Sequence, residues 1–392
     1  MEANPLRTVD IRQHNRNLIL SGIYRSRLSG GASQSDLVKT TGLKAPSVFR
    51  IVSSLEDEGL IRPCIKATMQ NDSKKGRKPL RYTVCPGALY TIGVEFWASC
   101  ISLGVFDFNG SRVFCDLFNI PSDFDIDHVV SQIVVMVNSA IAAKSIEREK
   151  IIGVGVAAAG KVDVHSGVIV YYHRIKGISN YPLMATLSKA LDLPVLVHNN
   201  CSAFAFDTYN HSNLKDGSLF TFLLRSGVNG TLVGHRGRIF LESDGTNFEA
   251  GHLPLDFDGP LCTCGLRGCL QAYLFEVSRE FDGQSDENSL FFNLEKPLID
   301  GDPKALEIVR RAALYMYSSI KCISRFIAPS AYMIVCLSDV VAENIASEIT
   351  RLLSQENDSL KRSTPSIFHE EYDNLHSQRG MSDMLLEQFF AR

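Results

Sequence analysis

Residues 251–269 read Gly-His-Leu-Pro-Leu-Asp-Phe-Asp-Gly-Pro-Leu-Cys-Thr-Cys-Gly-Leu-Arg-Gly-Cys, with one imidazole and three thiols within eighteen residues. The four side chains, His252, Cys262, Cys264 and Cys269, form a set that we call the His–Cys cluster. A tetrahedral zinc site takes four ligands of this kind, as neutral histidine nitrogen and cysteine thiolates. Four protein ligands leave no open position, so the stretch predicts a structural Zn²⁺ ion and not a catalytic one. The alternative is a loop that carries reduced cysteines without a metal.

The bulk composition is that of an ordinary soluble globular protein, with 45% hydrophobic and 21% charged residues in a chain of 392. This length is enough for two or three domains. The ten cysteines form no even framework, which favours a reducing, cytoplasmic setting over a disulfide-stapled one. The first residues, Met1–Pro5, lack the pattern of a signal peptide, and no run of about 18 apolar residues predicts a membrane span.

Charge is distributed unevenly along the chain. Residues 1–87 carry fifteen Lys and Arg against seven Asp and Glu, whereas residues 88–392 carry twenty-five against thirty-six. The formal net charge of −3 therefore combines a module of +8 with a body of −11. A small basic module on an acidic body suggests a polyanion as partner of the module. A solvated basic surface without a partner is the alternative.

The basic module has the pattern of a winged helix-turn-helix. Apolar periodicity predicts helices over residues 10–27, 33–40 and 45–58, followed by strands over 60–63 and 80–84. Ser33 is a good N-cap for the second helix, with Asp36 at the capping-box position. A helix, a short helix, a glycine-containing turn and a third helix make up the helix-turn-helix layout. The polar loop between the two strands would be the wing.

The third helix of this module would enter the major groove of double-stranded DNA by its N-terminal end. That end offers Lys44, Ser47 and Arg50, of which Arg50 could reach a guanine edge. Arg77 and Lys78 in the wing would meet phosphates or the minor groove. The alternative is a helical module that docks on another protein.

The body beyond residue 87 has the pattern of an α/β protein. A three-stranded meander, a helix and a strand are followed by a second round of strands and helices, which suggests two lobes with a cleft between them. We expect a DNA-binding domain over 1–87, a first lobe over 88–200 and a second lobe over 201–392. A final amphipathic helix over 381–390 is expected to pack back on the first lobe or to mediate subunit contact.

The order of motifs along the whole chain resembles that of the ROK family (repressor, open reading frame, kinase). The motifs are Gly93-Val-Glu95, the strand that ends at Gly160, the pair Asn199-Asn200, the sequence Glu249-Ala-Gly-His252 and the His–Cys cluster. The resemblance implies an actin-like, hexokinase-type fold with two lobes. Family members with an N-terminal winged helix are sugar-responsive transcriptional regulators of bacteria, and members without it are mostly sugar kinases. The repressors usually form dimers or tetramers.

The resemblance also indicates where this chain departs from the kinases of the family. Their general base is the Asp of an Asn-Asp pair, and Asn200 stands at that position. An amide has no proton-accepting state near neutral pH, so it cannot replace a carboxylate base. Trp97 and the loop that begins at Arg225 also replace smaller residues of the phosphate-binding segments. We therefore expect no catalytic residues and no enzyme activity; the alternative is a sugar kinase with degenerate motifs.

The sugar-binding positions of the family match Asn199, Asn200, Glu249, His252 and Gln271. Asn200 and Gln271 are amides where the family has carboxylates, and amides still bind a polyol by hydrogen bonds. The loss of two negative charges and the arrival of Arg225 suggest an acidic sugar or a sugar phosphate as one possible effector. A vestigial cleft without an effector is the alternative. His252 would link the metal to the effector, because metal ligation through one ring nitrogen fixes the orientation of the other.

Overall fold

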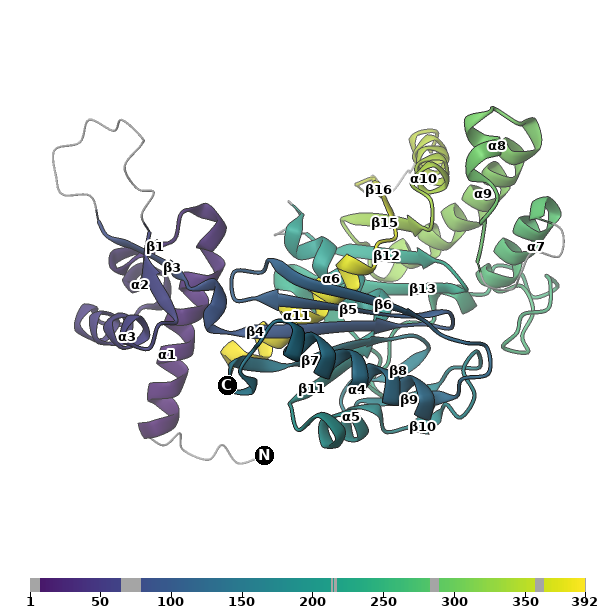
Figure 1. The fold of residues 1–392 in the computed structure, drawn as a ribbon. Coiled ribbons are helices and arrows are strands. Elements are labelled where there is room, and N and C mark those ends of the chain that lie inside the picture. Colours follow the sequence, from purple (N-terminus) through teal and green to yellow (C-terminus); the bar gives the residue numbers. More distant parts are fainter. Residues whose placement is uncertain are drawn as a thin grey trace.

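Figure 1 shows a small, mainly helical module beside a larger body that is built around two five-stranded sheets. This computed structural model describes residues 8–64, 79–212, 214, 217–282, 289–356 and 363–391. The predicted division at residues 87 and 200 stays a prediction, and the lobes are defined below by their sheets.

The N-terminal module has the predicted order of helices and strands. Its elements are α1 (Thr8–Arg25), β1 (Ala32–Ser33), α2 (Gln34–Thr41), α3 (Ala45–Asp57), β2 (Ile61–Pro63) and β3 (Arg81–Val84). The Ser33 hydroxyl accepts from the backbone N–H of Asp36, and the Asp36 carboxylate accepts from that of Ser33, so the predicted capping box is confirmed. Strand β1, which was not predicted, pairs with β3 on the side opposite β2. The wing residues Arg77 and Lys78 lie outside the described residues.

The first lobe is a mixed sheet with helices on both faces. Its strand order is β11-β7-β4-β5-β6, and β4 runs parallel to β7 and antiparallel to β5. The strands are β4 (Tyr90–Phe96), β5 (Cys100–Asp107), β6 (Arg112–Asn119), β7 (Ile151–Ala158) and β11 (Val195–Asn199). One face is covered by α4 (Ile126–Ala143) and α5 (Leu183–Leu191), whose apolar residues share one core with the strands. A small sheet of β8 (Lys161–Asp163), β9 (Val168–Tyr171) and β10 (Ser179–Tyr181) extends this lobe.

The second lobe repeats this plan. Its strand order is β14-β13-β12-β15-β16, with β12, β15 and β16 parallel to one another. The strands are β12 (Leu219–Leu224), β13 (Val228–Gly234), β14 (Arg238–Phe240), β15 (Ala331–Cys336) and β16 (Ser366–Glu371). The helices are α6 (Asn200–His211), α7 (Leu270–Asp282), α8 (Glu295–Ile299), α9 (Pro303–Phe326) and α10 (Asp339–Ser354). Helices α7 to α10 share one core with the sheet, and α6 packs on β12 and β13 in another.

The last helix, α11 (Asn374–Ala391), packs on the sheet of the first lobe, against β4 and β7, and also along α6. Glycines make this close approach possible, since a Cβ atom on Gly93 of β4 would lie 2.1 Å from the carbonyl oxygen of Gln378. A Cβ atom on Gly380 of α11 would lie 2.0 Å from the carbonyl oxygen of Ala203. Atoms cannot approach so closely, so both positions require a residue without a side chain.

Among the described residues, α4 is the one helix whose length and hydropathy would suffice for a membrane span. Its mean hydropathy is 1.5, and 44% of its residues are buried within the protein. Val129, Ile133 and Val137 on its inner side belong to the core of the first lobe. The apolar composition of α4 thus matches its packing against β5 and β6.

Candidate functional site

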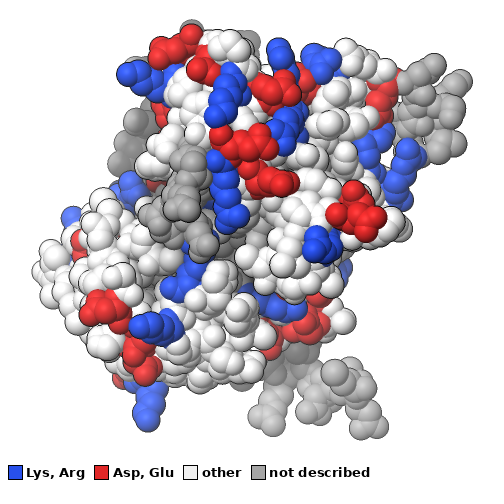
Figure 2. Space-filling model, turned by 90° about the vertical axis from the view of Figure 1, so that its right-hand side faces the viewer, with Lys and Arg blue, Asp and Glu red and all other residues white. Residues whose placement is uncertain are grey.

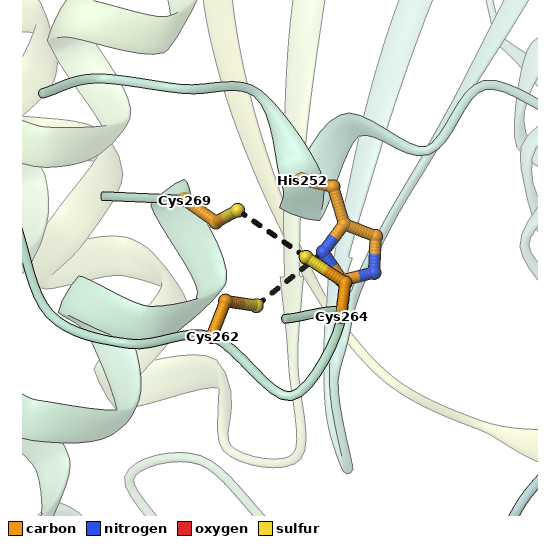
Figure 3. Close-up of side chains that lie close together, drawn as sticks. All are labelled: His252, Cys262, Cys264 and Cys269. Carbon is orange, nitrogen blue, oxygen red and sulfur yellow. Dashed lines mark hydrogen bonds between the residues drawn. The ribbon is translucent and has the colours of Figure 1, made fainter. Parts of the chain in front are cut away.

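The His–Cys cluster comes together in space, as Figure 3 shows. His252 ends the short 3-10 helix η5 (Ala250–His252), Cys262 and Cys264 lie in the following loop, and Cys269 directly precedes α7. The four ligand atoms lie within 4.8 Å of one another. Cys262 Sγ is 3.5 Å from His252 Nδ1, and Cys264 Sγ is 3.7 Å from Cys269 Sγ. Zinc–sulfur bonds of about 2.3 Å at tetrahedral angles place two sulfurs about 3.8 Å apart, so these distances fit a zinc ion.

The backbone of this loop is folded to present the thiols. Cys262 N–H donates to the carbonyl of Leu266, and Gly268 N–H donates to that of Pro260. Gly268 has φ +70°, and a Cβ atom there would lie 1.4 Å from the carbonyl oxygen of Asp256, so only glycine fits. Burial, with its neighbouring thiols, raises the pKa of Cys269 to about 12. A bound cation would offset the repulsion between several thiolates at such close range.

Three of the predicted effector residues, Asn199, Asn200 and Glu249, lie where the two lobes meet. Asn199 is the N-cap of α6: its Oδ1 accepts from Cys201 N–H at 2.9 Å, and its Nδ2 donates to the Gly160 carbonyl at 2.8 Å. Asn200 is buried in the first turn of the same helix. The carboxylate of Glu249 is half exposed and pairs with Lys161 of the first lobe at 3.6 Å. That ion pair crosses from one lobe to the other.

Gln271 is turned toward the protein backbone. Its Oε1 accepts from the N–H of Val228 at 2.9 Å, at the start of β13. One end of this amide is therefore occupied by the loop that precedes β13, and its Nε2 lies 3.5 Å from the Thr263 hydroxyl. Gln271 thus holds this loop in place. A Cβ atom added to Gly227 would lie 3.1 Å from the same amide oxygen.

Asn247 is a further polar residue of this region that the sequence analysis did not identify. Its Nδ2 donates to the hydroxyls of Ser202 and Thr231 and lies 3.4 Å from Asn199 Oδ1. Its Oδ1 is buried and has no partner among the described residues. A buried acceptor without a donor is costly, so this oxygen is well suited to a ligand hydroxyl. The available signal was an amide two residues before Glu249 in a glycine-containing stretch.

Arg225 is not a free cation, which corrects the suggestion that it would attract an acidic effector. Its side chain is only 4% exposed, and its Nη1 donates to Glu95 Oε1 at 3.3 Å. The guanidinium lies 4.3 Å from the ring centres of both Trp97 and Tyr372. The carboxylate neutralises the charge, and the two aromatic faces enclose it. Protein atoms therefore enclose the guanidinium of Arg225.

The exposed face of α3 carries the predicted DNA contacts. Lys44 and Arg50 are exposed, and Ser47 is half-buried. Phe49 lies beside Arg50 and is 60% exposed, although it is a large apolar residue. Phe49 was not among the predicted contacts; its signal in the sequence is an aromatic residue off the apolar stripe of the helix. Such a side chain can contact a thymine methyl group in the major groove.

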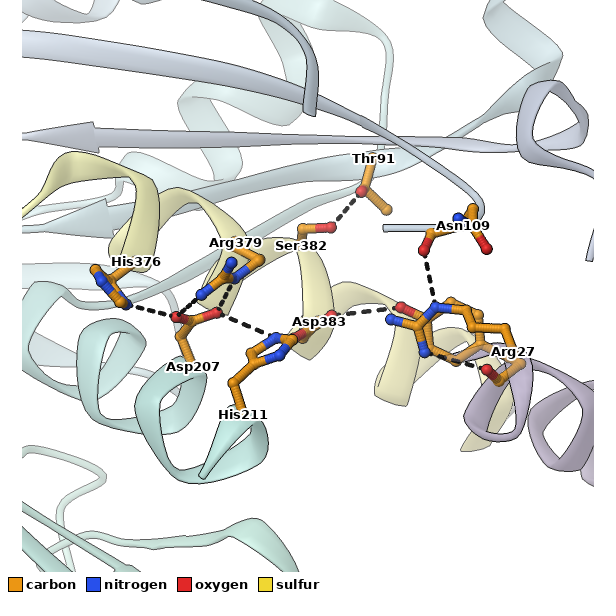
Figure 4. Close-up of polar contacts among 10 residues, drawn as sticks. Arg27, Thr91, Asn109, Asp207, His211, His376, Arg379, Ser382 and Asp383 are labelled. Carbon is orange, nitrogen blue, oxygen red and sulfur yellow. Dashed lines mark hydrogen bonds and ion pairs between the residues drawn. The ribbon is translucent and has the colours of Figure 1, made fainter. Parts of the chain in front are cut away.

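The module is attached to the body through α11, as Figure 4 shows. Tyr24 of α1 donates to Asp383 at 3.4 Å, and Arg25 pairs with Glu387 at 2.7 Å. The core of the module also includes Leu386 and Phe390 of α11, with Phe390 5.4 Å from the ring of Tyr24. The module and α11 therefore share one hydrophobic core.

Charges on the far side of the body are mixed. Figure 2 shows basic and acidic side chains side by side on the face of the second lobe. Interspersed charges of both signs are typical of a solvated surface and not of a site for a polyanion.

Comparison with known proteins agrees with this architecture. The sequence model of the ROK family matches residues 91–388. The chain is 22% identical to the xylose repressor of Bacillus spizizenii, over 97% of this chain and 96% of that protein. The structure is similar to that of a ROK family transcriptional regulator, a homolog of the Escherichia coli MLC protein, with 19% identity, a TM-score of 0.78 and 97% of each chain covered.

A kinase structure matches a smaller part of the chain. The ROK family glucokinase of Streptomyces griseus, in complex with glucose and AMPPNP, has a TM-score of 0.62 at 20% identity. It covers 75% of this chain and 98% of its own. Since the family model spans the body from β4 to α11, and the motifs above lie within it, this chain belongs to the ROK family.

Proposed function

We propose that this protein is a transcriptional repressor that binds operator DNA and responds to a sugar. The observation that carries the proposal is the pairing of a helix-turn-helix module with a ROK body. The resemblance to the kinases of the family, which would place Asn200 at the position of their catalytic base, supports it. The relative from Bacillus spizizenii, similar over nearly the whole chain, is named a xylose repressor. A role in the regulation of carbohydrate metabolism in the cytoplasm follows from the same likeness.

The site argues against phosphoryl transfer to a sugar. Asn200 is neutral and cannot accept the proton of a sugar hydroxyl, a role that typically contributes about 10²–10⁴-fold in rate. Arg225 and Glu95 are buried as an ion pair beside Trp97, in segments that resemble the phosphate-binding segments of the family's kinases. Both features speak against kinase activity.

DNA recognition would use the exposed face of α3. Lys44, Ser47 and Arg50 would face the major groove, and Arg77 and Lys78 of the wing would contact the backbone or the minor groove. The acidic residues at the far end of α3 favour contact by the N-terminal half, since the exposed carboxylates of Glu56 and Asp57 would be repelled by phosphate. A homodimer or homotetramer would present two such modules to half-sites about 34 Å apart, or a multiple of that distance.

The effector would be bound by Asn199, Asn200, Glu249, His252 and Gln271. A neutral sugar is favoured over an acidic one, because Glu249 remains a carboxylate acceptor and Arg225 is neutralised by Glu95. The free acceptor of Asn247 adds a sixth polar group to this set. Sugar hydroxyls both donate and accept, which suits such a mixture of amides and one carboxylate.

A structural Zn²⁺ ion would be held by His252, Cys262, Cys264 and Cys269. When bound, it supplies a fixed anchor for the loop and holds the imidazole of His252 in one orientation. The Nδ1 atom of His252 faces Cys262 at 3.5 Å, which leaves Nε2 available for a ligand. The metal would thus shape the effector site without taking part in chemistry.

The test begins with a thermal-shift screen of neutral sugars, acidic sugars and sugar phosphates on the purified protein. A neutral sugar should raise the melting temperature and change the affinity for a duplex selected by the protein from a random pool. An assay for ADP release with ATP and the same sugars should show no steady turnover. Turnover that is abolished by Asn200→Ala would overturn the proposal, and so would a protein that selects no duplex at moderate ionic strength.

A further inference from the structure

We propose that α11 carries the effector state from α6 to the DNA-binding module, with Asp207 as the buried positioning residue that joins the two helices. The inference rests on the proposed function, because it takes Asn199 and Asn200 as effector contacts. Those two residues lie at the N-terminal end of α6, and Asp207 and His211 lie near its other end. One rigid helix of 12 residues therefore spans from the effector site to the junction with α11.

Asp207 ties α6 firmly to α11. Its carboxylate is fully buried and accepts from Arg379 Nε at 2.6 Å, from Arg379 Nη2 at 2.7 Å and from His376 Nδ1 at 2.8 Å. A bidentate arginine–carboxylate pair has a fixed geometry, and separating it in a buried place would leave an uncompensated charge. The described residues near Asp207 also include His211 and Asp383, but the guanidinium already uses both carboxylate oxygens, which argues against a metal ion there.

Backbone packing adds to this link. Gly380 of α11 rests on the carbonyl of Ala203 in the first turn of α6, where a side chain would not fit. His211 at the end of α6 lies between two carboxylates, 3.6 Å from Asp207 and 3.5 Å from Asp383. The two helices are thus joined along two turns, and a displacement of α6 cannot be absorbed by sliding between them.

The other end of α11 is part of the module itself. Asp383 accepts from Tyr24, the side chain of Asn17 donates to the carbonyl of Phe389 at 3.3 Å, and Phe390 packs on Tyr24. The module has a second contact, from Arg27 Nε to the carbonyl of Asn109 at 2.8 Å, in the turn between β5 and β6 (Figure 4). The first contact lies on α11 and the second on the first sheet, on which α11 itself packs closely at Gly93. Even a small tilt of α11 against that sheet would therefore change the orientation of the module about the turn at Asn109.

The test compares the sugar dependence of DNA binding in the full-length wild type and in Asp207→Asn. D-xylose serves as the probe and a duplex selected by the wild-type protein as the DNA. Coupling between two sites is typically worth a factor of about 5–150 in affinity, so xylose should change the wild-type Kd for DNA by at least about fivefold. In Asp207→Asn we expect a change below about twofold, while the Kd for xylose, measured by calorimetry, stays within about threefold of the wild-type value.

A control variant and a second test variant distinguish the possible outcomes of this experiment. Glu348→Gln removes an ion pair with Arg351 on α10, away from the proposed path, and should keep the full response. If Asp207→Asn does not fold, Phe390→Leu, which loosens the contact with Tyr24, should also reduce the response at unchanged xylose affinity. A full response in the variant that folds would overturn the inference. A wild-type protein that binds xylose and DNA without any mutual effect would instead overturn the sugar-responsive function on which the inference rests.

Discussion

The docking of α11 can be tested by a substitution whose two possible effects have opposite signs. Gly380 lies in the interior of α11, where alanine has the higher helix propensity by about 1 kcal/mol. If α11 were a loosely attached helix, Gly380→Ala would therefore stabilise the protein. In the packed structure the new methyl group would lie 2.0 Å from the carbonyl oxygen of Ala203 and 2.8 Å from the carbonyl carbon.

The expected size of the effect follows from the kind of atom that is contacted. The obstacle is backbone of α6 and cannot rotate away, so the two helices would have to separate by about 1 Å. Overpacking typically costs about 1–3 kcal/mol, and a rigid backbone partner places this site at the upper end. After the gain in helix propensity, we expect a net loss of about 2 kcal/mol in the free energy of unfolding.

The assay is urea denaturation followed by circular dichroism and by the fluorescence of Trp97, the single tryptophan. The matched control is Gly22→Ala in α1, where a Cβ atom would meet only the end of the Leu37 side chain at 3.0 Å. That side chain can move, so the gain of up to about 1 kcal/mol in helix propensity should leave this variant as stable as the wild type or more stable. Equal midpoints for the two variants, or a stabilised Gly380→Ala, would refute the packing of α11 on α6.

Three further predictions concern the metal, the DNA and the pH. Cys264→Ser should lose zinc, measured by elemental analysis, and melt at a lower temperature. The control, Cys322→Ser at an exposed cysteine, should change neither the zinc content nor the melting temperature. Equal zinc content in the two variants would contradict the structural site. Arg50→Ala should weaken binding to a selected duplex by about 1–3 kcal/mol in filter or fluorescence titrations, and a loss as large on random DNA would show that Arg50 contacts only phosphate. Burial lowers the pKa of His198 from 6.5 to about 4, so the unfolded chain takes up a proton that the folded one resists. Stability should therefore fall as the pH falls from 6.5 to 4, by about 3 kcal/mol from this group, and His198→Gln should show a shallower fall in urea midpoints over that range.

Features set by neighbouring residues could be predicted from the sequence. The capping box at Ser33, the three helices of the module and the His–Cys cluster all depend on short spacings, and the structure has them where they were expected. Strand β1 could not be predicted, because it has only two residues and therefore shows no periodicity.

Features that depend on distant parts of the chain could not be predicted. The neutralisation of Arg225 cannot be predicted from the sequence because its partners are remote: Glu95 lies 130 positions earlier and Tyr372 comes from the C-terminal segment. The place of α11 between the first sheet and α6 depends on Gly93 and Gly380, whose close contacts leave no local pattern. The predicted effector residues remain a proposal for the same reason, since their meeting depends on how the lobes are arranged.

The burial of Arg225 between Trp97 and Tyr372 has a consequence for how this part of the chain can change. Arg225 could not be replaced alone, because Glu95 would then be a buried carboxylate without a counter-charge. Glu95 could not be replaced alone either, since the buried guanidinium would lose its carboxylate partner. The two positions are therefore expected to change only together, as a coupled pair.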